Sequence, residues 1–317
     1  MSEISLPFFM FGIKPTRSRI FIYKAYKRWM QMIRFGPSGN SESFYEQGYK
    51  SSVQMPAWLA EMGLNAYEYQ CSKGVKVSEP TARNIGEEAL KNGIFLSIHA
   101  PYYINMASEE EEKRINSKNY ILETLICARW MGAKRIVVHT GSYSKVDKKW
   151  ALNMVCEVMK EVLREAREQG LDDIVICPEV LGKQNQLGSL EEILEICKID
   201  ERLIPTVDFG HVHARGLGAL NCVEDFDEVL NKIEKALGNE RLKNLHCHFS
   251  RIEFTKGGEK KHWTIDDIQF GPDFEHLAIA IHKKQMEPVI ICESRDNMAE
   301  DALKLKKIYE SVGGDRK

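Results

Sequence analysis

The chain has 317 residues, 43% of them hydrophobic, and its 44 basic and 46 acidic side chains give a net charge of −2. This length is ordinary for one large α/β domain, and the near-neutral charge excludes a generally basic nucleic-acid binder. A local positive patch or bound metal ions would still attract a phosphate. Eight cysteines without a C-x-x-C pair indicate reduced thiols, and no apolar run reaches the roughly 18 residues of a membrane span. We therefore expect a soluble, cytoplasmic protein.

The first 31 residues form the least regular part of the chain. They carry a basic and aromatic run from Arg17 to Trp29. A nucleic-acid or membrane contact is one interpretation, and a poorly ordered extension, or a true start at Met30 or Met32, is the other. We favour the extension, because the first expected strand begins at Met32. The expected organisation is an N-terminal extension over 1–31 and one domain over 32–317.

Short apolar runs between turn signals recur along the rest of the chain, as is typical of buried parallel strands. Eight strands are expected near residues 32–35, 65–69, 94–98, 137–139, 176–179, 206–208, 244–246 and 291–293. Helical patterns lie between them, at 81–92, 109–131, 148–169, 189–197, 223–237 and 273–284. Regular alternation of strand and helix predicts a parallel sheet with right-handed crossovers, and eight strands are the number in a single (β/α)8 TIM barrel.

Six of these strands stop on a side chain of a type that binds divalent metals. The six residues are His99, His139, Glu179, Asp208, His246 and Glu293. A single such residue is most simply explained by a local hydrogen bond. Six in succession make coincidence a poor explanation, because the C-terminal ends of barrel strands all open on one face. We therefore expect the six side chains to converge on one site.

Two further histidines enlarge this set. His211 lies one turn beyond the sixth strand, and His262 lies in a long loop after the seventh. Eight ligands are too many for one zinc ion, which takes about four, and suit two or three ions. Mixed imidazole and carboxylate ligands favour zinc, manganese or iron over magnesium or calcium. Such a centre activates water as hydroxide and predicts hydrolysis of a phosphate ester, with Glu179 as the best candidate to bridge two ions and hold the nucleophile.

The chain resembles the endonuclease IV family of apurinic/apyrimidinic endonucleases, within the wider xylose isomerase-like barrel superfamily. The resemblance spans about residues 32–305 and rests on an ordered set of segments: 99–105, 139–142, 178–179 with Gly182, 187–188, 208–211 continuing through 214–216, 246–250 and 293–294. It implies a trinuclear-zinc phosphodiesterase that cuts the DNA backbone on the 5′ side of an abasic site and leaves a 3′-hydroxyl. It also implies that all eight ligands keep their family roles.

One position departs from the family pattern. The family has an acidic ligand two residues before the histidine that matches His262, and this chain has Lys260 there. Glu259 could supply the carboxylate if the loop shifts, and His248, where the family usually has an amide, could also compensate. The departure bears on the third metal ion and on full nuclease competence.

The resemblance also implies a DNA-binding rim, because the family bends DNA and swings the abasic nucleotide into the metal pocket. Tyr102 and Tyr103 occupy the loop that would enter the base stack, with ordinary packing at the rim as the alternative. The Gly-hinged, basic stretch after the seventh strand, with Arg251 and Lys256, suits phosphate contacts. A plain solvated loop explains it equally well.

Three functions stay open at this point. The leading one is a zinc-dependent, monomeric endonuclease acting on double-stranded DNA with abasic sites. A metal-dependent sugar or sugar-phosphate isomerase or epimerase uses the same barrel, but with one ion and about four ligands, and the excess of histidines argues against it. The third, a catalytically impaired member that only binds damaged DNA, rests on Lys260 alone.

Overall fold

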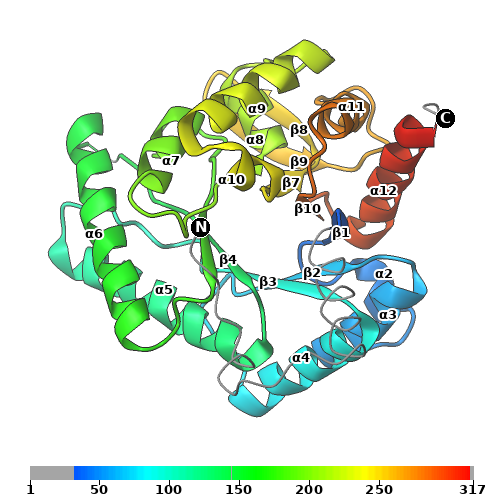
Figure 1. The fold of residues 1–317 in the computed structure, drawn as a ribbon, viewed down its shortest axis with the longest axis horizontal. Helices are drawn as coiled ribbons and strands as arrows, with labels where there is room; N and C mark the ends of the chain where they lie inside the picture. The colour runs from blue at the N-terminus through cyan, green and yellow to red at the C-terminus, as the bar shows by residue number, and fades with distance from the viewer. Residues whose placement is uncertain (1–31, 144, 315–317) are drawn as a thin grey trace, which may run out of the picture. The chain divides into compact units, whose positions relative to one another are not determined.

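A computed structural model describes residues 32–143 and 145–314 of the chain (Figure 1), so the expected extension over 1–31 lies outside the described residues. The expected parallel barrel strands are present, each within a few residues of its predicted position. They are β1 (Arg34–Pro37), β2 (Ala66–Gln70), β3 (Phe95–His99), β4 (Arg135–Val138), β5 (Val175–Pro178), β6 (Thr206–Asp208), β7 (His246–Phe249) and β10 (Val289–Cys292).

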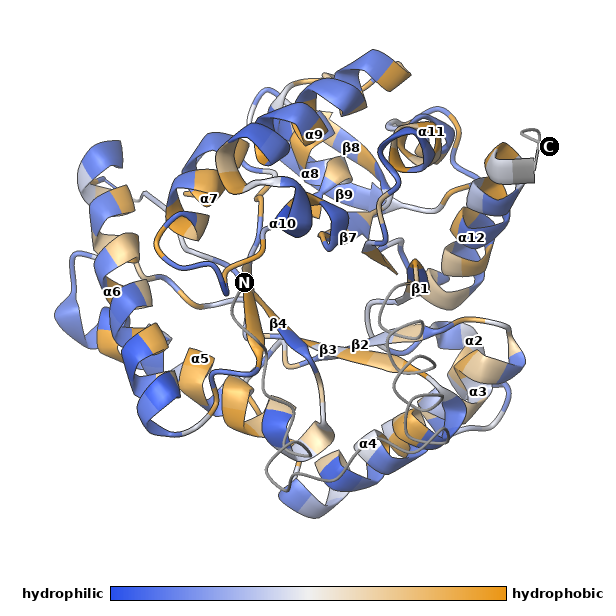
Figure 2. Ribbon diagram, in the orientation of Figure 1, coloured by the Kyte–Doolittle hydropathy of each residue, from blue (hydrophilic) through white to orange (hydrophobic). Residues whose placement is uncertain are grey.

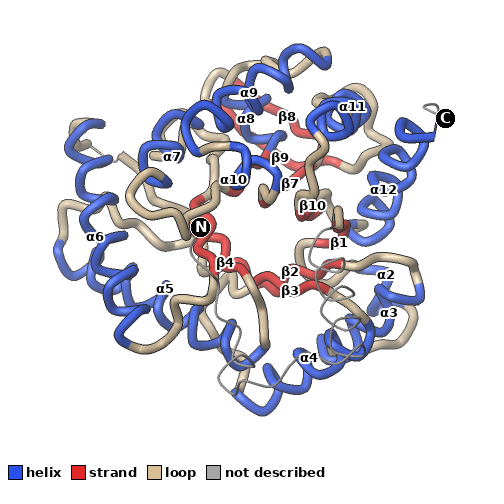
Figure 3. The backbone as a smooth tube through the Cα atoms, in the orientation of Figure 1, coloured by secondary structure: helices blue, strands red, loops and turns tan. Residues whose placement is uncertain are grey.

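These strands form two parallel four-stranded sheets that meet at both edges. One sheet has the order β1-β10-β7-β6 and the other the order β2-β3-β4-β5. Isolated parallel bridges link the sheets, from Ser38 to Glu68 beside β1 and β2, and from Glu179 to Thr206 beside β5 and β6. The strands therefore follow one another around a central ring with the helices outside it, as in a TIM barrel (Figure 3).

The helices surround the strands and turn their apolar sides toward them (Figure 2). In α6, five buried residues between Ala151 and Val162 recur at helical spacing, and the Asp147 side chain caps the first turn by accepting from the N–H groups of Lys149 and Trp150. The described helices are α2 (Glu42–Glu46), the 3₁₀ turn η1 (Ser52–Gln54), α3 (Met55–Glu61), α4 (Glu79–Asn92), α5 (Glu111–Met131), α6 (Lys148–Glu168), α7 (Leu190–Cys197), α8 (Phe209–Arg215), α9 (Val223–Leu237), α10 (Asn239–Lys243), α11 (Phe274–Lys284) and α12 (Met298–Gly314).

The segment expected to be a long loop after the seventh strand is instead an antiparallel hairpin. It consists of β8 (Arg251–Thr255) and β9 (Gly258–Trp263), joined by Lys256 and Gly257. Ile252 and Phe254 alternate with polar residues before this two-residue turn, which is a hairpin signal. The prediction that His262 lies in a long loop was therefore wrong, because this residue lies in β9.

Most of the cysteines are buried in the core. All eight are free thiols, and six of them are buried. None of the helices in the described ranges combines the length and the apolar character needed to cross a membrane. The hydrophobic core fills the ring of strands and the layer between the strands and the helices. Its large buried residues include Phe35, Phe249 and Phe274.

Candidate metal centre

Five candidate ligands meet at one rim of the barrel. His99 and Asp208 are the last residues of β3 and β6, whereas His139, Glu179 and Glu293 directly follow β4, β5 and β10. Parallel strands bring their C-terminal ends to the same rim. The expectation that these side chains converge therefore agrees with the described geometry.

Glu179 lies at the centre of the first group, with His99 and His139. Its Oε2 atom is 2.9 Å from Nε2 of His139 and 3.3 Å from Nε2 of His99. The Nδ1–H of His99 donates to the carbonyl of Ala100 at 2.8 Å, which turns Nε2 toward Glu179. The ligand atoms of the three residues lie within 4.8 Å of one another, so they could hold one metal ion.

The second group shares Glu179 and adds Asp208, His248 and Glu293. Nδ1 of His248 is 3.2 Å from Oε1 of Glu179 and 3.4 Å from Oε1 of Glu293. Ser38 donates a hydrogen bond to the same Glu293 oxygen at 3.0 Å. The four ligand atoms again lie within 4.8 Å of one another.

The third group joins α8 to the β8–β9 hairpin. It comprises Asp208, His211 and His262. The Nε2 atoms of the two histidines are 3.3 Å apart. The other ring nitrogens are held from behind, His211 Nδ1 by the carbonyl of Val180 at 3.0 Å and His262 Nδ1 by the hydroxyl of Ser250 at 2.8 Å. Both Nε2 atoms therefore face the same point.

A β-bulge in the hairpin brings Glu259 to this third group in place of the expected acidic residue at position 260. Glu253 pairs with Lys261 and Phe254 with Glu259, so Lys260 is the extra residue of the bulge. In a regular strand, residues three apart point to opposite faces, and one extra residue restores them to the same face. Glu259 thus turns inward with His262.

Interatomic distances and the close packing at Gly182 support Glu259 as a member of the third group. Glu259 Oε2 is 3.5 Å from His211 Nε2, and its Oε1 is 3.7 Å from His262 Nε2. Lys260 instead pairs with Glu253 at 2.6 Å on the exposed side of the hairpin. At Gly182, an added Cβ would lie 2.6 Å from Glu259 and 2.9 Å from His211. Only glycine lets the hairpin approach this closely.

His246 does not join these three groups, and it forms a fourth group of ligand-type side chains with Glu68 and His248. The sequence suggested a strand that ends on His246, but this residue begins β7. In the register of the sheet, His248 is level with Asp208, whereas His246 is level with Thr206, one pleat deeper. Both side chains point to the same face because they are two residues apart. His246 Nε2 contacts Glu68 at 2.9 Å instead.

The charges of the cluster are strongly coupled. Burial alone would raise the pKa of Glu179, but His139 and His248 hold it well below its usual value. Burial opposes protonation of His99, yet Glu179 raises its pKa to about 9. In the same way burial disfavours the charged form of His262, and Glu259 raises its pKa to about 9. Without metal, the carboxylates therefore hold protons on these imidazoles.

The donor set suits divalent metal ions. Glu179, Asp208 and Glu293 bring three carboxylates into one group, and Asp208 Oδ2 is buried without a hydrogen-bond partner. Buried like charges and an unpaired buried oxygen are unfavourable unless a cation compensates them. Two histidine nitrogens that face each other across 3.3 Å also suit a shared ion. Imidazole with carboxylate is a zinc-type ligand set.

Two hollows flank the metal-ligand cluster. One is lined by His139 together with Tyr102 and Tyr103, and the other by His262 and Glu293 together with Lys261, Ser294 and Arg295. Tyr102 is 58% exposed, whereas Tyr103 packs edge-on against Tyr120 with ring centroids 4.9 Å apart. Of the two tyrosines, Tyr102 is thus the freer to contact a ligand.

The two basic residues predicted to bind DNA lie in different surroundings. Arg251 is buried, and its guanidinium donates to the carbonyls of Ile265 and Phe270 and contacts Asp273. Through these contacts the Arg251 guanidinium holds the loop after the hairpin, so it is not free to bind a phosphate. Lys256 is exposed at the hairpin turn, where the sequence suggested it.

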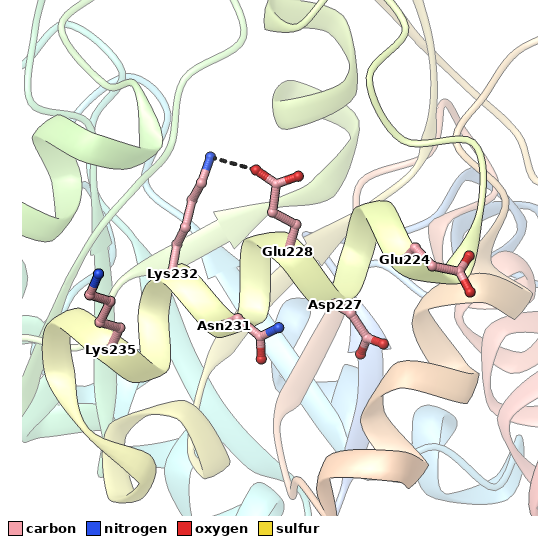
Figure 4. Close-up of a pocket in the computed structure, with 6 residues that line it drawn as sticks. All are labelled: Glu224, Asp227, Glu228, Asn231, Lys232 and Lys235. Carbon is pink, nitrogen blue, oxygen red and sulfur yellow. Dashed lines mark ion pairs between the residues drawn. The ribbon is translucent and has the colours of Figure 1, made fainter.

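A further hollow lies away from the cluster, along the outer side of α9 (Figure 4). Its lining comes from charged and polar side chains of one helix, with Lys232 and Glu228 paired at 3.1 Å. Salt bridges of this exposed kind, four residues apart, are ordinary helix-surface contacts. The residues that line this hollow include no buried metal ligand or nucleophile. The candidate catalytic site is therefore the strand-end cluster.

Sequence comparisons agree with the architecture. The profile of a family described as xylose isomerase-like TIM barrel matches residues 56–309. An uncharacterised protein of Methanocaldococcus jannaschii is 33% identical over 281 residues, which cover 89% of this chain and 98% of that protein. A probable endonuclease 4 of Oceanobacillus iheyensis is 30% identical over 209 residues, or 63% of this chain and 67% of that protein.

Solved structures of two enzyme types share the fold. A D-tagatose 3-epimerase-like protein superposes with a TM-score of 0.65 at 21% identity, covering 89% of this chain and 97% of that chain. Endonuclease IV of Thermus thermophilus gives a TM-score of 0.62 at 20% identity, covering 89% and 99%. At these identities the likeness shows the fold, and the choice between chemistries rests on the site.

Proposed function

The chain belongs to the xylose isomerase-like TIM-barrel family, and on this basis we propose that it is a metal-dependent DNA phosphodiesterase of the endonuclease IV type. Its substrate would be double-stranded DNA, cut on the 5′ side of an abasic site. One observation carries the proposal: of four groups of ligand-type side chains among the described residues, three share members and lie at one rim of the barrel. A single ion takes about four ligands, so three groups suit a multinuclear centre.

Each of three sets of residues would hold one ion of the metal centre. His99 and His139 with Glu179 would hold one ion, Glu179 with Asp208, His248 and Glu293 a second, and Asp208 with His211, His262 and Glu259 a third. We propose zinc, in two or three ions. Bound there, the ions would neutralise the phosphate and supply the Lewis acidity that hydrolysis needs.

Glu179 has the central role in this proposal. Its two oxygens face different groups, Oε2 toward His99 and His139 and Oε1 toward His248. A carboxylate shared in this way would help to hold two ions, whose positive charge would stabilise the attacking and leaving oxygens of the phosphate. The depressed pKa of Glu179 keeps it anionic for this purpose at neutral pH.

The DNA strand would cross the rim from one flanking hollow to the other. The exposed Tyr102 borders one hollow, and Lys261 and Arg295 border the other. An aromatic ring can occupy the gap left by a missing base, while basic side chains contact phosphates. Lys256, at the exposed hairpin turn, would add a phosphate contact, and Arg251 is not proposed for this role.

Tyr102→Ala is expected to weaken binding of an abasic duplex by about 1–3 kcal/mol, the usual contribution of one base–aromatic stack. Tyr103→Ala should lower thermal stability more than affinity, because this ring packs against Tyr120. Fluorescence anisotropy with abasic and intact duplexes measures the difference. Equal affinity of wild type and Tyr102→Ala for the abasic duplex would remove Tyr102 from the proposed interface.

Glu259→Gln and Lys260→Gln form a matched pair of neighbouring substitutions. Glu259→Gln is expected to lower incision by at least about 10-fold, as losses around metal ligands commonly do. Lys260→Gln removes an exposed pair with Glu253 and should leave the rate unchanged within about twofold. Incision rates, together with the zinc content of each protein at a fixed chelator concentration, test both expectations. A larger loss of incision in Lys260→Gln than in Glu259→Gln would mean that residue 260, not residue 259, contributes to the metal centre.

Zinc affinity is expected to rise with pH up to about 9. The pKa values of His99 and His262 are about 9 without metal, so both imidazoles are protonated at neutral pH and zinc must displace the protons. Each displaced proton raises the apparent affinity about tenfold per pH unit below that pKa. Chelator competition at pH 6.5, 7.5 and 8.5 tests this expectation. An affinity independent of pH would contradict the protonated metal-free state.

A sugar epimerase is the second candidate, because one observation favours it. The group of Glu179, Asp208, His248 and Glu293 would by itself complete a single-ion site with four ligands. The first and third groups have no role in a one-ion epimerase, which makes this candidate weaker. The third candidate, a protein that binds damaged DNA without cutting it, rests on Lys260, and the approach of Glu259 to His211 at 3.5 Å counts against it.

Incision of a defined lesion tests the proposal. A 5′-labelled duplex with one tetrahydrofuran abasic analogue is incubated with zinc-loaded protein, beside an intact duplex. The analogue cannot undergo β-elimination, so a lyase does not cut it. The proposal predicts zinc-dependent incision 5′ of the analogue and a 3′-hydroxyl that a polymerase extends. Absence of incision by metal-loaded protein would refute it.

A further inference from the structure

Glu68 is a buried carboxylate that the proposed chemistry does not use. It lies in the middle of β2 and is fully shielded from solvent. Ser97 donates a hydrogen bond to its Oε2 atom at 2.8 Å, and His246 Nε2 contacts the same oxygen at 2.9 Å. Its Oε1 atom is 3.1 Å from Nε2 of His248. Among the described residues, these two histidines are the ionisable groups with which Glu68 pairs.

This arrangement constrains the protons on both rings. A buried carboxylate without a lysine or arginine partner needs hydrogen-bond donors to compensate its charge. Since carboxylate oxygens only accept, His246 donates its Nε2–H to Oε2 of Glu68. Oε1 of Glu68 and Nε2 of His248 are buried 3.1 Å apart without another hydrogen-bond partner, so a proton on this Nε2 would compensate both atoms. Nδ1 of a neutral His248 is then left with its lone pair. Without metal, Nδ1 is hydrogen-bonded to Oε1 of Glu179 at 3.2 Å and lies 3.4 Å from Glu293, in the place where the second metal ion would lie.

We propose that Glu68 is a positioning residue that fixes His248 as the Nε2–H tautomer, so that His248 binds the second metal ion through Nδ1. This inference rests on the proposed metal centre. His246 is then the second hydrogen-bond donor to Glu68 and not a ligand. An acidic partner behind a metal-binding histidine commonly fixes its ring and increases its basicity.

The proposal sets His248 apart from the other candidate histidine ligands. His99, His139 and His211 direct Nε2 toward the cluster, and so does His262. In His99 and His211, Nδ1 is engaged by a backbone carbonyl, so Nε2 would be the nitrogen that gives up its proton to a metal ion. His248 would be the exception, with its metal on Nδ1 and its proton on Nε2.

Glu68→Gln tests the role of the carboxylate with little change in shape. Ser97 donates to Oε2, so the amide oxygen is favoured at that position and the NH2 group faces His248. Nε2 of His248 must then accept, which moves its proton to Nδ1 and blocks metal binding there. We expect the affinity for one zinc ion to fall about 10- to 100-fold, with the other ions retained. Glu192→Gln is the control and should keep all ions, because the half-buried Glu192 carboxylate lies outside the ligand groups and accepts from the Ser189 N–H at the start of α7.

Nitrogen NMR of the wild-type protein gives an answer even if Glu68→Gln does not fold. Histidine labelled with ¹⁵N and a centre loaded with ¹¹³Cd report which ring nitrogen carries the metal through ¹¹³Cd–¹⁵N coupling. We expect one histidine coupled through Nδ1, with a protonated Nε2, and the others coupled through Nε2. The Nδ1-coupled signal should vanish in His248→Asn and persist in His246→Gln.

Three outcomes separate the two proposals. Coupling through Nε2 alone, or unchanged zinc affinity in a folded Glu68→Gln protein, would overturn the role of Glu68 and leave the nuclease proposal standing. Loss of the Nδ1 coupling in His246→Gln, but not in His248→Asn, would restore His246 as the ligand. A protein that shows the Nδ1 coupling but does not cut DNA would refute the nuclease and support the role of Glu68.

Discussion

Glu179→Gln is expected to lower zinc-dependent incision of an abasic duplex by about 10²- to 10⁴-fold, the range typical of a group that acts directly on the reaction. The substitution keeps the size of the side chain but removes a charge that faces His99, His139 and His248. Both the first and the second ligand groups contain this carboxylate. Single-turnover incision rates at saturating zinc measure the effect.

Asp301→Asn is the matched control for this substitution. Asp301 is also fully buried, but it accepts from the Ile265 N–H and pairs with Lys304, outside the ligand groups. We expect it to lower stability by about 1–3 kcal/mol through a weakened buried hydrogen bond, with an incision rate close to wild type. A Glu179→Gln protein as active as Asp301→Asn would exclude Glu179 from the reaction.

Removal of the metal ions is expected to abolish incision and to lower the melting temperature by on the order of 10 °C. Each ion present at a thousand times its Kd contributes about 4 kcal/mol to the free energy of unfolding. The physical reason is the cluster itself, because Glu179, Asp208 and Glu293 are left as close carboxylates without a compensating cation. Thermal unfolding before and after chelation, and after zinc is restored, measures the shift.

The same measurement on Glu179→Gln provides the internal control. This variant lacks the carboxylate shared by two groups, so its melting temperature should respond less to chelation than that of the wild type. A wild-type melting temperature that does not change on chelation would show that the cluster holds no ion tightly. The multinuclear site would then have to be abandoned.

The barrel and most of its rim were predictable because the signals are local. A short apolar run that ends on a polar residue, as at His99, Asp208 and Glu293, places that residue at a strand end regardless of the rest of the fold. Once the alternation of strands and helices indicates a parallel barrel, those ends must share one rim. Packing details are not needed for this step.

The choice between His246 and His248, and between Lys260 and Glu259, depends on register, which the sequence does not encode locally. His246 and His248 lie on the same face of one strand, and only the pairing of β7 with β6 decides which is level with Asp208. The bulge at Lys260 likewise depends on how β9 pairs with β8. The contacts of Glu68 with two histidines about 180 positions away arise from the tertiary arrangement of β2 and β7, and the sequence offered no signal for them.

The most direct test compares the two enzyme chemistries in one zinc-loaded preparation. One portion receives the 5′-labelled tetrahydrofuran duplex, and another receives ketohexoses in D₂O, in which epimerisation would exchange a carbon-bound hydrogen for deuterium. Our account predicts incision 5′ of the analogue and no deuterium in the sugars. Deuterated epimers with an uncut duplex would contradict it and assign the group of Glu179, Asp208, His248 and Glu293 to a single-ion epimerase.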